Sequence, residues 1–123
     1  MNQDHEPFFT GYDLSRDLFE TILGYADALG SVQLQISKTQ ISLRRGKAFA
    51  WVWIPAMHTG RRSPKLAPLV LTLSFDHPHG SPRWKEIVQV SAHRFTHHLE
   101  VWRAEDIDAE VRGWLRDAWE RTA

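Results

Sequence analysis

The chain of 123 residues has no cysteine, which excludes disulfides, thiolate catalysis and metal sites built on Cys. Any metal would need His, Asp or Glu as ligands. Long apolar runs are also missing, because those at residues 48–56 and 67–73 fall well short of the roughly 18 residues that indicate a membrane span. The first twelve residues lack the basic and apolar regions of a secretory signal. We therefore expect a cytoplasmic protein with no membrane partner.

Acidic residues are scarce in the middle of the chain. Residues 31–94 carry ten Lys and Arg against two acids, whereas the two flanks together carry thirteen acids against five bases. The formal net charge of zero hides this segregation. It predicts a two-faced electrostatic field whose positive side attracts an anionic partner.

Periodicity predicts the fold class. Apolar residues recur at helical spacing over residues 13–29, where Asp13 is the expected N-cap, and again over residues 107–118, after acids that begin at Glu105. Alternation and short apolar runs predict strands at residues 32–36, 41–44, 48–54, 69–75 and 95–101, while residues 84–90 fit either a strand or a helical turn. We expect an α+β two-layer sandwich in which both helices cover one face of a four- to five-stranded antiparallel sheet.

The same pattern sets the expected boundaries and exposed segments. Residues 13–121 should form a single domain after a mobile tail at residues 1–12. Residues 56–68, rich in Pro, Gly and basic residues, should form an exposed basic loop. In the strand at residues 48–54 we expect Ala50, Val52 and Ile54 to face the helices, which leaves Phe49, Trp51 and Trp53 as an aromatic strip on the outer face. A register shift of one residue would exchange the two sets.

One stretch resembles a known family. Residues 38–50 step from Lys38-Thr39 into a strand, turn at Arg45-Gly46-Lys47 and start the next strand near Phe49. A Leu-rich strand at residues 69–73, a His-containing segment at residues 93–95 and a Glu-Asp-Ile-Asp start to the last helix follow. The chain thus resembles a bacterial family of domains of unknown function, which occur alone and as the C-terminal unit of predicted transport proteins. The resemblance implies a small α+β fold and brings no activity, cofactor or catalytic residue.

Basic and aromatic residues together indicate a binding surface. Cations can follow a phosphate backbone while indoles stack on bases, which is the usual pairing in proteins that bind single-stranded nucleic acid. Our first hypothesis is a non-enzymatic module that binds an anionic ligand, such as nucleic acid, without a cofactor. The candidate ligand-binding residues are Lys38, Arg44, Arg45, Lys47, Trp51, Trp53, Arg61, Arg62, Arg83, Trp84 and Lys85.

Two alternatives stay open. The first is a protein-interaction or homodimerisation domain whose interface is the aromatic strip. The second is a His-assisted or metal-dependent enzyme that uses His77, His79 and His97 with Asp76. Because His97 and His98 are adjacent in a strand, they point to opposite faces and at most one of them joins such a site. No nucleophile elbow, phosphate-binding glycine loop or dinucleotide fingerprint is present, and we assign no catalytic residue.

Overall fold

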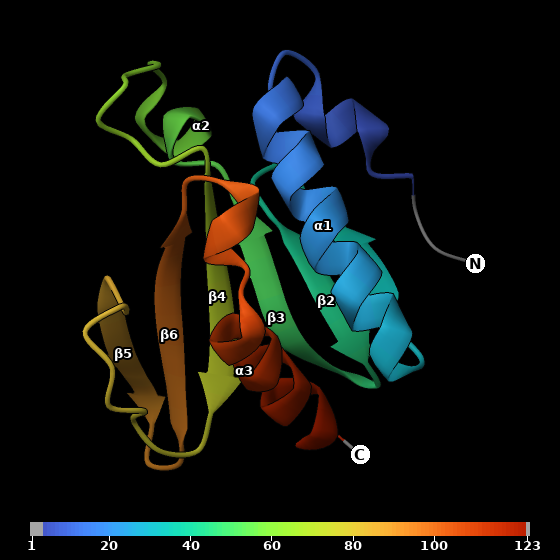
Figure 1. The fold of residues 1–123 in the computed structure, drawn as a ribbon, viewed down its shortest axis with the longest axis vertical. Coiled ribbons are helices and arrows are strands. Elements are labelled where there is room, and N and C mark those ends of the chain that lie inside the picture. The colour runs from blue at the N-terminus through green and yellow to red at the C-terminus, as the bar shows by residue number, and fades with distance from the viewer. Residues whose placement is uncertain (1–3, 123) are drawn as a thin grey trace.

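Six antiparallel strands form one sheet in the computed structural model, which describes residues 4–122 (Figure 1). They lie in the order β1-β2-β3-β4-β6-β5. Their bounds are Gln33–Ile36 (β1), Ile41–Arg45 (β2), Lys47–Trp53 (β3), Leu69–Phe75 (β4), Glu86–Ser91 (β5) and Arg94–Val101 (β6). The sequence predicted four to five strands and left residues 84–90 open, because β5 is an edge strand whose segment lacks a clear alternation of apolar and polar residues.

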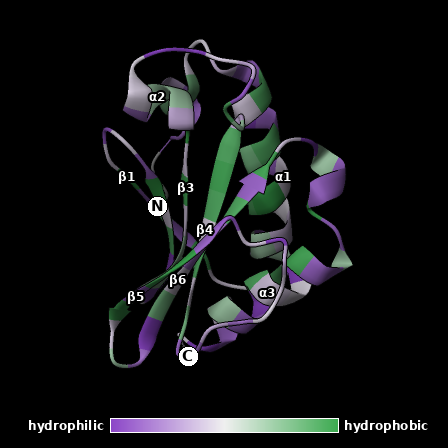
Figure 2. Ribbon diagram, turned by 90° about the vertical axis from the view of Figure 1, so that its left-hand side faces the viewer, coloured by the Kyte–Doolittle hydropathy of each residue, from purple (hydrophilic) through white to green (hydrophobic). Residues whose placement is uncertain are grey.

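Two long helices cover one face of the sheet, as predicted (Figure 2). Helix α1 spans Asp13–Leu29 and buries Leu18, Phe19 and Ile22. Asp13 is its first helical residue rather than its cap, since the N-cap position belongs to Tyr12. Helix α3 spans Ala109–Glu120, and the Asp108 carboxylate caps it by accepting a hydrogen bond from the backbone N–H of Val111 at 3.1 Å. Within residues 4–122 no helix is long and apolar enough to cross a membrane.

A short helix occupies part of the expected basic loop. Helix α2 spans Pro55–Thr59, with Pro at its first position and Gly60 as its C-cap at a φ of 75°. Proline fits the first turn because its missing N–H has no helical partner there, and glycine adopts the left-handed cap without strain. The remaining residues of that segment carry exposed cations, including Arg61 and Arg62.

A β-bulge corrects the predicted aromatic strip. The pairing of β2 with β3 shifts between Leu43 and Arg44, which pair with Ala50 and Ala48, so Phe49 is an extra residue in β3. A bulge redirects side chains locally. Phe49 accordingly joins the hydrophobic core beside Ala50, at 1% exposure, instead of facing outward.

Beyond the bulge, the predicted alternation of β3 holds. Val52 and Ile54 are buried, whereas Trp51 and Trp53 are half-buried. Thr72 pairs with both Trp51 in β3 and His98 in β6, so these three side chains share the face of the sheet that α1 and α3 leave uncovered. We call this the outer face.

The segment before α1 is packed rather than a loose tail. A 3₁₀ helix, η1, spans Glu6–Phe9, and Phe9 stacks on Phe19 with ring centroids 5.3 Å apart. Apolar burial explains the difference, because Phe9 is 2% exposed and belongs to the core. Residues 1–3 of the predicted tail lie outside the described residues.

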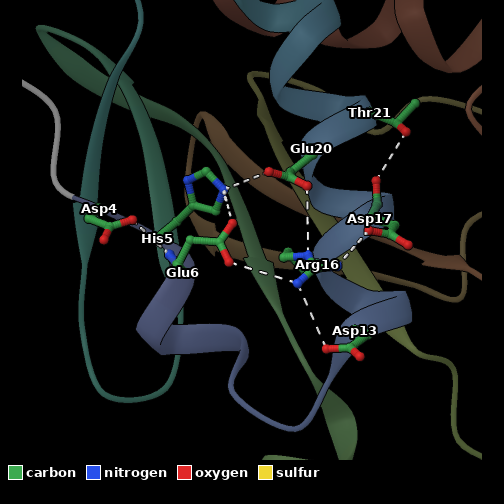
Figure 3. A network of polar contacts seen from close by, with 8 residues as sticks. All are labelled: Asp4, His5, Glu6, Asp13, Arg16, Asp17, Glu20 and Thr21. Carbon is green, nitrogen blue, oxygen red and sulfur yellow. Dashed lines mark hydrogen bonds and ion pairs between the residues drawn. The ribbon is translucent and has the colours of Figure 1, made fainter.

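Polar contacts also hold this segment on α1 (Figure 3). His5 Nε2 lies 3.2 Å from Glu20, and Arg16 lies 3.8 Å from both Glu6 and Glu20. His5, Glu6 and Glu20 are also a grouping that could hold a metal ion by distance alone. The Arg16 guanidinium already pairs with Glu6 and Glu20 and would repel a cation, so we read the cluster as structural.

The substitution Phe9→Ala tests whether residues 4–12 belong to the folding unit. Removing a fully buried phenyl ring leaves a cavity and should lower the free energy of unfolding by about 3–5 kcal/mol. Urea denaturation followed by circular dichroism measures this. The matched control is Phe8→Ala, which removes a half-buried ring and should cost less than half as much. Equal and small losses in both variants would restore the interpretation of a loose tail.

Candidate anion-binding site

One basic cleft lies where two hairpin turns meet at the same end of the sheet. Arg44 and Lys47 flank the β2–β3 turn, in which Gly46 takes the left-handed φ of 74°. His93 and Arg94 come from the β5–β6 turn, which the antiparallel pairing of β3, β4 and β6 brings to this end. Together with Trp51 and Arg121, these four residues line a cavity of about 540 Å³, which we call the lower cleft.

Three cations of the lower cleft have no acidic partner. Among residues 4–122, Arg44, Lys47 and Arg94 form no ion pair, and Arg44 only donates a hydrogen bond to the Gly46 carbonyl at 3.2 Å. Arg121 is different, because it pairs with Asp76 at 2.7 Å. The cleft therefore carries uncompensated positive charge, which favours an anionic ligand.

A second basic cleft lies at the opposite end of β3, where α2 follows. Lys38, Arg61 and Arg62 line a cavity of about 550 Å³ together with Tyr12 and Met57, which we call the upper cleft. Arg62 is held in place, since its guanidinium stacks 4.0 Å from the centroid of the Tyr12 ring and donates a hydrogen bond to the Gly11 carbonyl. Lys38 and Arg61 are exposed and, within the described chain, form no ion pair.

Between the two clefts, the outer face holds a smaller cavity of about 300 Å³. We call it the indole pocket. Its lining includes Trp51, Trp53, Gln40, Thr72, His98 and Arg94. The Trp53 indole N–H donates to the Thr72 hydroxyl oxygen at 3.3 Å, and that hydroxyl lies 2.8 Å from His98 Nδ1. The three strands β3, β4 and β6 thus join in one hydrogen-bonded row.

Charge in the indole pocket is limited to one side chain. Burial lowers the pKa of His98, so its imidazole is neutral at pH 7, although Glu86 opposes the shift. Arg94 is the charged member of the lining, and its guanidinium lies 5.7 Å from the centroid of the Trp51 ring. Because Arg94 also lines the lower cleft, it connects the two cavities.

Two predicted ligand-binding residues lie away from the outer face. Trp84 is 8% exposed and packs against Trp114 of α3, with ring centroids 4.2 Å apart. Arg83 binds the carboxylates of Asp108 and Glu110, each at 2.9 Å. The acids at the start of α3 hold Arg83, and its neighbour Trp84 lies in the core on the helix side. The structure therefore gives these two residues a structural role.

Two further predicted residues are engaged by the protein itself. The Arg45 guanidinium stacks on the Trp119 ring of α3 at 3.6 Å, on the helix side of the sheet. Lys85 pairs with Glu100 at 3.1 Å. Of the eleven predicted residues, the structure thus gathers seven along the outer face and its two ends: Lys38, Arg44, Lys47, Trp51, Trp53, Arg61 and Arg62.

Sequence reasoning did not assign Gln40, Thr72, His98, His93 or Arg94 to the binding site. Alternation alone tells which face of its own strand each of Thr72 and His98 occupies. Their meeting with Trp51 depends on the register of β3, β4 and β6, which no sequence pattern in this chain specifies.

The three histidines of the metal-enzyme alternative lie next to one another, but ring nitrogens of His97 and His77 are engaged within the protein. His97 is fully buried, its Nε2 accepts the backbone N–H of His79 at 3.0 Å, and its Nδ1 donates to the Phe95 carbonyl at 3.2 Å. Both ring nitrogens are therefore used within the protein. His77 stacks on His79 but hydrogen-bonds Asp76 at 2.6 Å. This hydrogen bond and those from Arg121 lower the pKa of Asp76 to about 2.

The chain is an α+β domain whose outer sheet face bears Trp51 and Trp53, and it belongs to a known family. A family profile described as Domain of unknown function (DUF5655) matches residues 6–122. This confirms the resemblance to a family of unknown function, while the link to transport proteins stays a prediction. Comparison with curated proteins gives no match, and comparison with solved structures gives none either.

Stability should fall as the pH drops below about 6.5, because burial lowers the pKa of His97 from its ordinary value of 6.5. Below that pH the unfolded chain takes up a proton that folded His97 resists, whereas above it the full stability is present. His79 and His98 act in the same direction, since burial lowers their pKa values too. Urea unfolding at pH 8 and pH 5 measures the loss.

The variant His97→Gln isolates the contribution of the buried ring. It removes one titrating group, so the loss of stability between pH 8 and pH 5 should shrink, even though the variant is less stable than the parent at pH 8. An unchanged pH dependence in His97→Gln would show that His97 does not contribute to the acid sensitivity.

Proposed function

We propose that the protein is a non-enzymatic binding module that holds an anionic ligand at its lower cleft. The observation that carries the proposal is the convergence of Arg44, Lys47 and Arg94, three cations without an ion-pair partner among residues 4–122. Folding normally places surface charges near opposite charges when the sequence supplies them, as it does for Arg83 and Arg121. Holding three like charges together is unfavourable unless an anion binds there.

The ligand that best fits both clefts is a polyanion, and we propose single-stranded nucleic acid. The two clefts lie at opposite ends of β3, whose seven residues span about 23 Å at about 3.3 Å per residue. A single phosphate group cannot reach both, whereas a chain of phosphates can. Trp51 and Trp53 lie between the clefts, where they can stack on bases.

Charge on the helix side supports this orientation. Exposed acids follow α1, at Asp13, Asp17 and Glu20, and others lie at Glu105 and Glu110 near the start of α3. They repel a phosphate backbone from the helix-covered side. A polyanion that approaches the protein is therefore directed toward the lower and upper clefts, where the unpaired cations lie.

The homodimer alternative loses one of its three proposed contact residues. Phe49 is in the core, so the outer aromatic strip consists of Trp51 and Trp53. The exposed apolar side chains Leu14, Ile87 and Val90 come from different elements, α1 and β5. We therefore rank a dimer interface below the binding of a polyanion.

The combined charge reversal Arg44→Glu, Lys47→Glu and Arg94→Glu tests the proposal. Fluorescence anisotropy with a labelled single-stranded decamer, measured across a salt series, gives the affinity and its salt dependence. Each lost phosphate contact should reduce the slope of log K against log salt by about 0.7, so the triple variant should lose about 2 units. Its melting temperature should change little, because these side chains form no ion pair with residues 4–122.

The matched control is Arg116→Glu, a reversal at an exposed position of α3 on the opposite side of the sheet. It should leave the salt slope intact. If the parent protein does not bind the decamer at low salt, or if the triple variant keeps the full slope, nucleic acid does not bind at the lower cleft. The mass of the protein in solution, recorded in the same buffer, tests the dimer alternative.

A further inference from the structure

The indole pocket differs in chemistry from the two clefts on either side of it. Its walls are the rings of Trp51 and Trp53, and its polar groups include the amide of Gln40, the hydroxyl of Thr72 and the imidazole of His98. Amides, hydroxyls and neutral imidazoles donate and accept hydrogen bonds without preferring an anion. A cavity with these walls suits a flat, uncharged, polar-edged group rather than a phosphate.

The pocket is rigid on the side of Trp53. The indole N–H is fixed by Thr72, and the ring meets His58 edge-on at a centroid distance of 4.9 Å. A second edge contact, at 6.3 Å, comes from His98. A ring held this way loses little conformational freedom when a ligand packs against it, which favours binding.

Position connects this pocket to the anion site. Trp51 and Arg94 line both the indole pocket and the lower cleft. A ligand that fills both cavities must therefore carry a planar polar ring on one side of Arg94 and a negative charge on the other. A nucleotide unit has this arrangement, with its base joined through the sugar to a phosphate.

We propose that the indole pocket takes up one unpaired base of the bound strand, whose adjoining phosphate lies in the lower cleft. This inference rests on the proposed function and names the part of the ligand that the protein reads. Gln40 precedes β2 beside Trp53, and its amide offers one donor group and one acceptor to the edge of the base. Trp51, next to Arg94, supplies the stacking surface.

The experiment compares two labelled decamers that share the same backbone charge. One is a single-stranded deoxyadenosine decamer, and the other is a decamer in which every base is replaced by an abasic sugar. Anisotropy at one fixed salt concentration should show that the parent protein binds the base-bearing strand roughly tenfold or more tightly, since stacking on an aromatic side chain has an effect of this size.

Variants locate the preference in the pocket. Trp51→Ala and Gln40→Ala should each bring the affinities of the two decamers closer together, without weakening the binding of the abasic strand. Gln40 is exposed, so its substitution leaves the fold intact if Trp51→Ala should prove unstable. The matched control is Trp102→Ala, which removes a 39% exposed indole that does not line the indole pocket and should keep the full preference.

The possible failures are distinguishable. Equal affinity of the parent protein for both decamers overturns the base pocket and leaves the proposed anion-binding function standing. Binding of neither decamer at low salt overturns both. A preference for the base-bearing strand that survives in both Trp51→Ala and Gln40→Ala places the base elsewhere and also overturns the inference.

Discussion

Two helices cover only one face of the six-stranded sheet, so on the other face the side chains of the strands must themselves shield the sheet from water. Strand β4 shows the consequence, because Val70 and Thr72 are 1% and 5% exposed although no long helix covers their side of the sheet. The bulky indoles of β3 provide much of this cover, and the Trp53–Thr72–His98 hydrogen bonds satisfy the polar groups that become buried with it. The same residues that complete the fold therefore also form the walls of the indole pocket.

The distribution of charge follows from the same division into two faces. Acids concentrate in the helical flanks and bases in the strands and turns, so folding into two layers separates them in space. Some basic side chains contact the helix layer instead: Arg45 stacks on Trp119, and Arg83 binds the acids at the start of α3. The cations that remain available lie at the two ends of the sheet, in the lower and upper clefts. The available charge is thus a smaller and more localised set than the composition suggests.

Local patterns predicted those parts of the fold that local forces determine. The stripe over residues 13–29 predicted the bounds of α1 because helical burial depends on spacing within one segment. The edge strand β5 was ambiguous because it has few buried residues, and the packing of η1 was missed because burial of Phe9 depends on Phe19. The bulge at Phe49 depends on how two strands pair, and the burial of Trp84 depends on Trp114, which lies thirty positions further along the chain. Sequence reasoning therefore named many of the residues that line the candidate site and could not arrange them.

Two adjacent histidines bring the effect of acid to the two faces of the sheet. His97 is fully enclosed on the helix side, where its two ring nitrogens bind backbone groups of the protein, so protonation there opposes folding. His98, the next residue, lies on the outer face and contacts Thr72 and Trp53. Its pKa is also lowered by burial, and protonation would place a positive charge inside the indole pocket, close to Arg94. Acid thus weakens the core through one residue and changes the charge of the outer face through its neighbour, because adjacent residues of a strand point to opposite sides of the sheet.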